Sequence, residues 1–181
     1  LKRLAEWARA EGLPLMVHAA ESPEEVAFLA RGEGPLREVY GRFAKTPWTP
    51  PGTTPVRHLH ALGVLGPTTL LVHGVQVDEE EVGLLAETGT KVVLCPRSNA
   101  NLEVGEAPLA LYAKHGVELA LGTDSRGSSP DLDVKNEARF LWGRAEPRLL
   151  VRALTRGGYR ALGLPTPRLT RGTPLSLVHF L

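Results

Sequence analysis

Short hydrophobic runs recur along the chain, and each is followed by a turn and then by apolar residues at helical spacing. Runs of this length predict strands, and the longer stretches between them predict helices. We expect strands ending near Val17, beginning at Thr69, and covering residues 91–95 and 117–123. Strands that alternate with helices predict an α/β fold with a parallel sheet, whose functional groups gather at the carboxyl ends of the strands.

Two of the expected helices carry clear start and stop signals. Ser22 is followed by a proline and two glutamates, which predicts an N-cap with a capping box, and Gly32 ends that helix. Asp78 precedes three glutamates in the same way, and Gly89 is the expected terminator. A Pro-, Thr- and Gly-rich stretch, 44–57, predicts a loop. Further helices are expected within residues 1–12, 56–62, 108–115, 132–142 and 147–162.

Composition narrows the functional classes. The chain has 181 residues, is 43% hydrophobic and has a formal charge of +1, so it can bury a core and favours neither nucleic acid nor an anionic membrane as partner. The one cysteine, Cys95, excludes an internal disulfide and fits a reducing compartment, so we expect a cytoplasmic protein. We expect Cys95 to pack as a small apolar residue. No apolar run approaches the ~20 residues that span a bilayer.

Three of the strand-like runs end at residues that suit a metal site: His18, His73 and Asp124. The carboxyl ends of parallel strands share one edge, so these side chains should lie together. Imidazole nitrogen and carboxylate oxygen are common ligands of zinc and iron. Gly74 would let the chain turn sharply and leave the His73 ring facing open space. Asp124 could instead cap the segment that follows it.

Polar residues near these strand ends are candidates for substrate contact or proton transfer. Glu21 could shuttle protons, or it could only decorate the start of the Ser22 helix. Arg97 and Asn99 follow a strand end and could face a substrate or satisfy loop carbonyls. The remaining histidines fall in helical or tail contexts and are taken as non-functional: His58, His60, His115 and His179.

Four stretches together resemble the amidohydrolase superfamily, in particular its chlorohydrolase and nucleobase- or nucleoside-deaminase branch. They are Val-His-Ala-Ala-Glu-Ser, Leu-Val-His-Gly, Val-Val-Leu-Cys-Pro-Arg-Ser-Asn and Leu-Gly-Thr-Asp-Ser, in this order. The resemblance implies the carboxyl-terminal half of a TIM-like (β/α)8 barrel, strands five to eight, over residues 1–165. Residues 166–181 would return to a small β-sandwich.

The resemblance also implies roles for individual residues. His18 and Asp124 would bind one divalent metal ion, zinc or iron, with zinc preferred. His73 would help to hold and polarise the attacking water, and Glu21 would handle the substrate and transfer protons. Beyond the resemblance, we expect Arg97, Asn99 and Ser125 to contact the substrate together with Glu21. We also expect His73 and Asp124 to act in catalysis, by orienting the metal-bound hydroxide.

One departure from the family pattern is severe, since the first-strand His-x-His pair is absent. The only similar string, His58-Leu59-His60, lies in an expected helix. The first residue is Leu1 rather than methionine, and we expect that something upstream is missing. A half barrel leaves strand edges unpaired, so we expect it to need the missing amino-terminal half or to self-associate.

The sequence thus predicts a metal-dependent hydrolase that acts on carbon–nitrogen bonds other than peptide bonds. The expected reaction is deamination of a purine-type or other N-heterocyclic amine, with this chain alone inactive. The alternative is a catalytically incomplete fragment or scaffold subunit that keeps the motifs and lacks the ligands.

Overall fold

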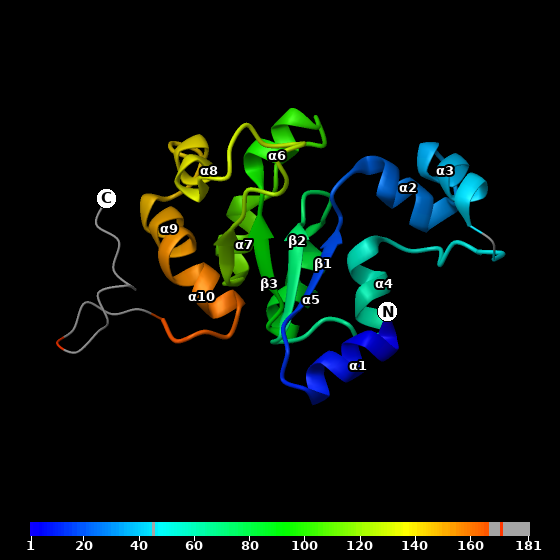
Figure 1. Ribbon diagram of the computed structural model, residues 1–181, viewed down its shortest axis with the longest axis horizontal. Coiled ribbons are helices and arrows are strands. Elements are labelled where there is room, and N and C mark those ends of the chain that lie inside the picture. Colours follow the sequence, from blue (N-terminus) through cyan, green and yellow to red (C-terminus); the bar gives the residue numbers. More distant parts are fainter. Residues whose placement is uncertain (45, 167–170, 172–181) are drawn as a thin grey trace.

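Four parallel strands form the central sheet of the computed structural model, which describes residues 1–44, 46–166 and 171 (Figure 1). The strands follow one another across the sheet in chain order, with helices between them. Their bounds are β1 (Leu15–Ala19), β2 (Thr69–His73), β3 (Lys91–Leu94) and β4 (Leu119–Leu121). The predicted α/β fold with a parallel sheet is therefore confirmed. The predicted tail strand, 175–181, lies outside the described residues.

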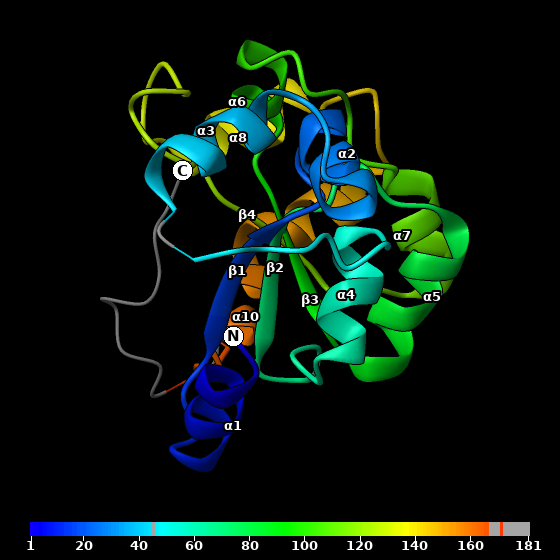
Figure 2. The same cartoon turned by 90° about the vertical axis from the view of Figure 1, so that its right-hand side faces the viewer.

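The helices occupy most of the chain between and after the strands. Those before β3 are α1 (Lys2–Ala10), α2 (Pro23–Arg31), α3 (Pro35–Phe43), α4 (Pro55–Ala61) and α5 (Glu79–Thr88). Those after β3 are α6 (Pro96–Asn101), α7 (Leu109–His115), α8 (Val134–Phe140), α9 (Pro147–Arg152), the π-helix η1 (Ala153–Gly157) and α10 (Gly158–Ala161). Figure 2 shows α4, α5 and α7 together on one side of the sheet. Within the described part, no helix has the length and apolar character needed to cross a bilayer.

Asp78 forms the predicted capping box, whereas Ser22 forms only the N-cap bond, because the Glu25 carboxylate accepts from the backbone N–H of Glu21 rather than from that of Ser22. The Ser22 hydroxyl accepts a hydrogen bond from the backbone N–H of Glu25 at 3.2 Å. Asp78 and Glu81 exchange both bonds of a capping box. Gly32 and Gly89 end α2 and α5 in the left-handed conformation, each with a φ of 69°, a backbone shape that glycine adopts without steric cost.

Helices α3 and α6 were not predicted, for different physical reasons. The apolar side chains of α3 do not enter the core: Leu36, Val39 and Phe43 are 38%, 51% and 78% exposed. Helix α6, with the sequence Pro-Arg-Ser-Asn-Ala-Asn, has no apolar periodicity at all. It buries polar side chains instead, so a search for hydrophobic spacing misses it. The strand β4 is also shorter than the predicted 117–123.

The sheet is covered on both faces over β2, β3 and β4. On one face, Leu71, Val92 and Leu119 join the main core. On the other, a smaller cluster collects Leu70, Val72, Val93, Cys95, Ala120 and Ala161 of α10. Cys95 is 2% exposed, which agrees with its predicted role as a small apolar residue. Strand β1 is an edge strand of this sheet, and its residue Met16 is 54% exposed.

Candidate metal centre

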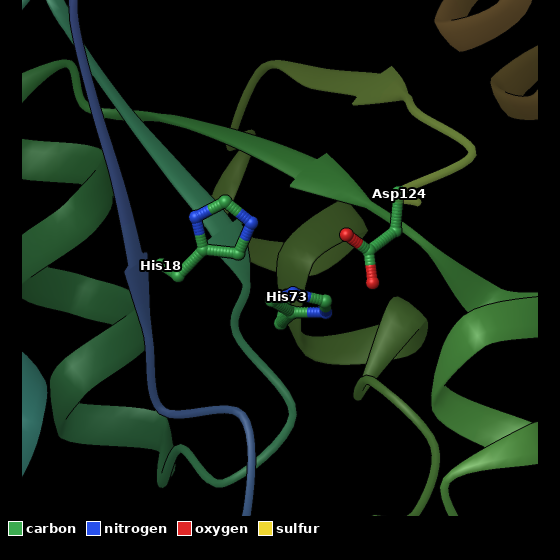
Figure 3. Close-up of side chains that lie close together, drawn as sticks. All are labelled: His18, His73 and Asp124. Carbon is green, nitrogen blue, oxygen red and sulfur yellow. The ribbon is translucent and has the colours of Figure 1, made fainter. Parts of the chain in front are cut away.

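The structure brings together the three side chains that the strand ends single out (Figure 3). His18 lies on β1, His73 ends β2, and Asp124 follows β4. One ligand atom from each residue lies within 4.8 Å of the other two. His18 is exposed, Asp124 is partly buried and His73 is fully buried. The cluster therefore sits at the carboxyl edge of the sheet, with one open side.

An unusual backbone conformation turns the His73 ring toward His18. In the parallel register His18 pairs with Val72, so a regular strand would place the next residue, His73, on the opposite face. His73 has a φ of 75°, in the left-handed region that L side chains rarely adopt. The two rings consequently lie with centroids 5.1 Å apart. Asp124 is also left-handed, with a φ of 58°. Such conformations concentrate at functional sites.

The expectation that the His73 ring faces open space was wrong, because the ring is 0% exposed. Its Nδ1 lies 2.8 Å from the Oδ1 atom of Asn99, and its Nε2 lies 3.6 Å from Oε2 of Glu21. The turn below it is closed by the Tyr112 hydroxyl, which donates to the carbonyl of Gly74. Within the described ranges, Nε2 of His73 is buried without a hydrogen-bond partner. That nitrogen is the one left for a ligand.

Two serine hydroxyls hold Asp124. Ser98 and Ser128 each donate to its Oδ2 atom at 2.7 Å. Burial raises the pKa of Asp124, but these hydroxyls and the nearby His73 outweigh it, so the pKa lies below its usual value. The carboxylate is therefore charged near neutral pH. The N-cap of the next helix, α8, is Asp133. Asp124 therefore does not cap the helix that follows it.

Glu21 lies beside the cluster, with its side chain 28% exposed. Its backbone N–H donates to Oε2 of Glu25 at 2.8 Å. Ser22 and Glu25 thus supply the capping bonds at the start of α2, and the Glu21 carboxylate is directed to His73 instead. Burial raises the pKa of Glu25 above its usual value.

The other predicted substrate residues have different surroundings. Both terminal guanidinium nitrogens of Arg97 donate to the Asp131 carboxylate, at 2.9 and 2.8 Å. Asn99 is 2% exposed and contacts His73. Ser125 is exposed and its hydroxyl accepts from the N–H of Gly127. The set-aside histidines lie on helices at 58, 60 and 115, and His179 lies outside the described residues.

Three residues that support the site were not predicted from the sequence: Ser98, Ser128 and Glu137. Ser98 stands in the quoted strand-end motif, next to Asn99, and that position is the one signal that could have drawn attention to it. Ser128 lies in an irregular segment. Glu137 is 0% exposed in α8, where a charged residue is normally expected to face solvent.

The residues present fit a divalent metal ion. Two imidazoles and a carboxylate form the type of donor set that zinc and iron accept. A buried polar atom without a partner is energetically costly, and a bound cation would satisfy Nε2 of His73. The hydrogen bond that the other ring nitrogen, Nδ1, donates to the amide oxygen of Asn99 is the usual support for a metal-binding histidine.

A parallel α/β sheet that carries a His–His–Asp cluster at its strand ends defines a protein with a candidate metal site. The chain belongs to the amidohydrolase family, whose sequence model matches residues 1–180. The resemblance seen in the motifs is thereby confirmed.

Relatives with assigned activities match nearly all of this chain. It is 42% identical over 188 residues to an aminodeoxyfutalosine deaminase of Deinococcus radiodurans, covering 95% of this chain and 44% of the relative. It is 33% identical over 192 residues to a 5-methylthioadenosine/S-adenosylhomocysteine deaminase of Halobacterium salinarum, covering 99% and 40%. The chain thus spans less than half the length of these relatives.

Solved structures share the fold. An adenosine deaminase from Xanthomonas campestris with bound zinc superposes with a TM-score of 0.71 at 30% identity, covering 90% of this chain and 35% of that one. An atrazine chlorohydrolase from Arthrobacter aurescens, complexed with zinc, gives 0.70 at 23% identity, covering 89% and 34%. At 23% identity, the similarity to the chlorohydrolase concerns the fold alone.

Proposed function

We propose that the chain forms the metal-binding, carboxyl-terminal half of a hydrolase that cleaves carbon–nitrogen bonds other than peptide bonds. The observation that carries the proposal is the convergence of His18, His73 and Asp124 beside Glu21. A cluster of this kind at the strand ends of an amidohydrolase suits the activation of water, and a carboxylate next to it suits proton transfer.

His18 and Asp124 would hold a divalent ion, with His73 as the third donor, and zinc is the ion bound in both solved relatives named above. Such an ion supplies a Lewis acid that makes a water molecule nucleophilic near neutral pH. Asp124 is fixed for this task because both serine hydroxyls bond to Oδ2, which leaves Oδ1 outside those two bonds.

Glu21 would move the protons of the reaction. Hydrolytic deamination adds the oxygen of water to an sp² ring carbon and releases the amino group as ammonia. Glu21 would pass one proton of the water to the adjacent ring nitrogen and the other to the departing amine. Its Oε2 atom lies 3.6 Å from Nε2 of His73, so it can serve atoms bound at the metal centre.

We propose a purine-type amine as the substrate, with other aminated N-heterocycles as the wider class. The support is the set of relatives named as deaminases of adenosine-type compounds. Ser125 directly follows Asp124 in the chain and is exposed, so its side chain would be accessible to a substrate. The side chains of Arg97 and Asn99 already bond to other residues of the protein. We therefore assign these two residues to support of the site rather than to substrate binding.

We further propose that this half contributes strands five to eight and works with an amino-terminal half that supplies the His-x-His ligands. The support is the chain's share of its relatives' length, together with the exposed His18 and Met16 on the edge strand β1. The completing half could come from the same polypeptide or another chain. Alone, the three donors should bind metal weakly and hydrolysis should be negligible.

Ammonia release tests the proposal. The protein carrying this half together with the first-strand ligands, loaded with zinc, should release ammonia from at least one aminated purine nucleoside in a panel that also includes aminated triazines. The same protein with Glu21→Gln is the matched control for contaminating activity. Tight zinc binding without ammonia release from any member would contradict deamination, and the absence of metal would support the scaffold alternative.

A further inference from the structure

Two consecutive residues of α6 touch two different members of the metal centre. The Ser98 hydroxyl donates to Asp124 at 2.7 Å, and the Asn99 amide oxygen lies 2.8 Å from Nδ1 of His73. Both residues are buried, at 0% and 2% exposure. One helical turn therefore connects the ends of β2 and β4, which do not pair with each other in the sheet.

Helix α6 is itself tied to α8 by buried charge. The Glu137 carboxylate, 0% exposed, accepts a hydrogen bond from the backbone N–H of Arg97 at 3.0 Å. The Arg97 guanidinium lies 3.5 Å from the other oxygen of Glu137 and bonds to Asp131 through both terminal nitrogens. Asn136, also on α8, donates to Asp131 at 3.1 Å. These bonds fix the start of α6, directly before Ser98.

We propose that α6 positions the metal ligands. Asn99 fixes the tautomer of His73, Ser98 orients Asp124, and Glu137 holds the helix in place through Arg97. The proposal rests on the proposed metal centre and adds the residues that set its geometry. These are positioning residues, because they act through His73 and Asp124.

The chemistry of neutral imidazole explains the role of Asn99. A neutral ring carries one N–H, and the opposite nitrogen keeps a lone pair. An amide oxygen beside Nδ1 favours the proton on Nδ1, which leaves the lone pair on the buried Nε2 for a metal ion. The amide oxygen of Asn99 is thus bonded to His73. The residue is also buried, so contact with a substrate is disfavoured.

The tautomer of His73 can be read directly. In metal-free protein with ¹⁵N-labelled histidine, two-dimensional NMR should show His73 with its proton on Nδ1. Asn99→Leu keeps the volume and removes the acceptor, so it should shift the ring toward Nε2–H, whereas Asn99→Asp should restore Nδ1–H. The matched control is Asn101→Leu, an exposed position on the same helix, which should leave the spectrum unchanged.

Metal affinity provides the second readout. Asn99→Leu, Ser98→Ala and Glu137→Gln should each weaken zinc binding by roughly 10- to 100-fold, the usual effect of removing support for a ligand. Asn101→Leu should not. A wild-type His73 protonated on Nε2, or unchanged zinc affinity in all three variants, would overturn the role of α6. Neither the tautomer nor the zinc affinity depends on turnover. Failure of the role of α6 can therefore be distinguished from failure of the deaminase proposal.

Discussion

Nε2 of His73 lies 3.6 Å from Oε2 of Glu21, inside a site where the His73 ring is fully buried. This nitrogen has no hydrogen-bond partner among the residues that the structure describes. Leaving a buried polar atom unpaired costs about 1–3 kcal/mol. The arrangement is understandable if the atom faces a bound group, and Glu21 is then placed to exchange protons with whatever that group activates.

Replacing Glu21 by Gln should leave the metal content nearly intact and lower the catalytic rate by about 10²–10⁴-fold, the range typical of lost proton transfer. Glutamine keeps the shape of the side chain and removes the carboxylate that could accept a proton and return it. Steady-state kinetics and metal analysis of the same preparation would check this. Glu24→Gln, an exposed position in the first turn of α2, is the matched control. Loss of metal together with activity would make Glu21 a ligand.

Replacing Tyr112 by Phe should destabilise the fold by about 1–3 kcal/mol, because the buried carbonyl of Gly74 would lose its hydrogen bond. Denaturant unfolding would measure the change. Tyr159→Phe, a less buried tyrosine of α10, should have a smaller effect. Equal stability of both variants would mean that the Tyr112 bond does not support the turn that follows His73.

Replacing Asp131 by Asn should have a pH-dependent effect on stability. Its bonds to Arg97, together with the backbone N–H of Asp133, hold the pKa of Asp131 well below its usual value of about 3.9. A group with a depressed pKa stabilises the fold above that usual value and loses the contribution as the pH falls. The stability difference from wild type should therefore be largest near neutral pH and shrink below about pH 4.

Chemical denaturation across this pH range would test the Asp131 prediction. Glu11→Gln, an exposed position after α1, serves as the control and should show little pH dependence. A stability difference for Asp131→Asn that is constant or grows on acidification would contradict the ion pair with Arg97 as a stabilising contact.

Most of the site features that could be predicted from the sequence lie at the strand ends. Apolar runs ending at His18, His73 and Asp124 indicate strands, and parallel strands place their carboxyl ends at one edge. That logic correctly brought the three side chains together. The N-caps at Ser22 and Asp78 were also predictable, because an N-cap depends on local sequence, although the full capping box forms only at Asp78.

Other features depend on tertiary contacts and left no local signal. The left-handed backbone at His73 reverses the direction expected for its ring. In helix α6, Ser98 and Asn99 have polar partners in Asp124, which follows β4, and in His73, which ends β2. The buried Glu137 is paired with Arg97. Partners distant in sequence cannot be inferred from hydrophobic spacing, which registers only apolar faces.

Metal location tests the central claim most directly. X-ray data collected at the zinc absorption edge from the zinc-loaded protein that carries this half together with the first-strand ligands should show an anomalous peak in contact with His18, His73 and Asp124. Asp124→Asn removes a charged ligand with nearly the same shape, so it should greatly weaken or abolish that peak and abolish turnover. A zinc peak elsewhere, or wild-type zinc occupancy and activity in Asp124→Asn, would contradict the account.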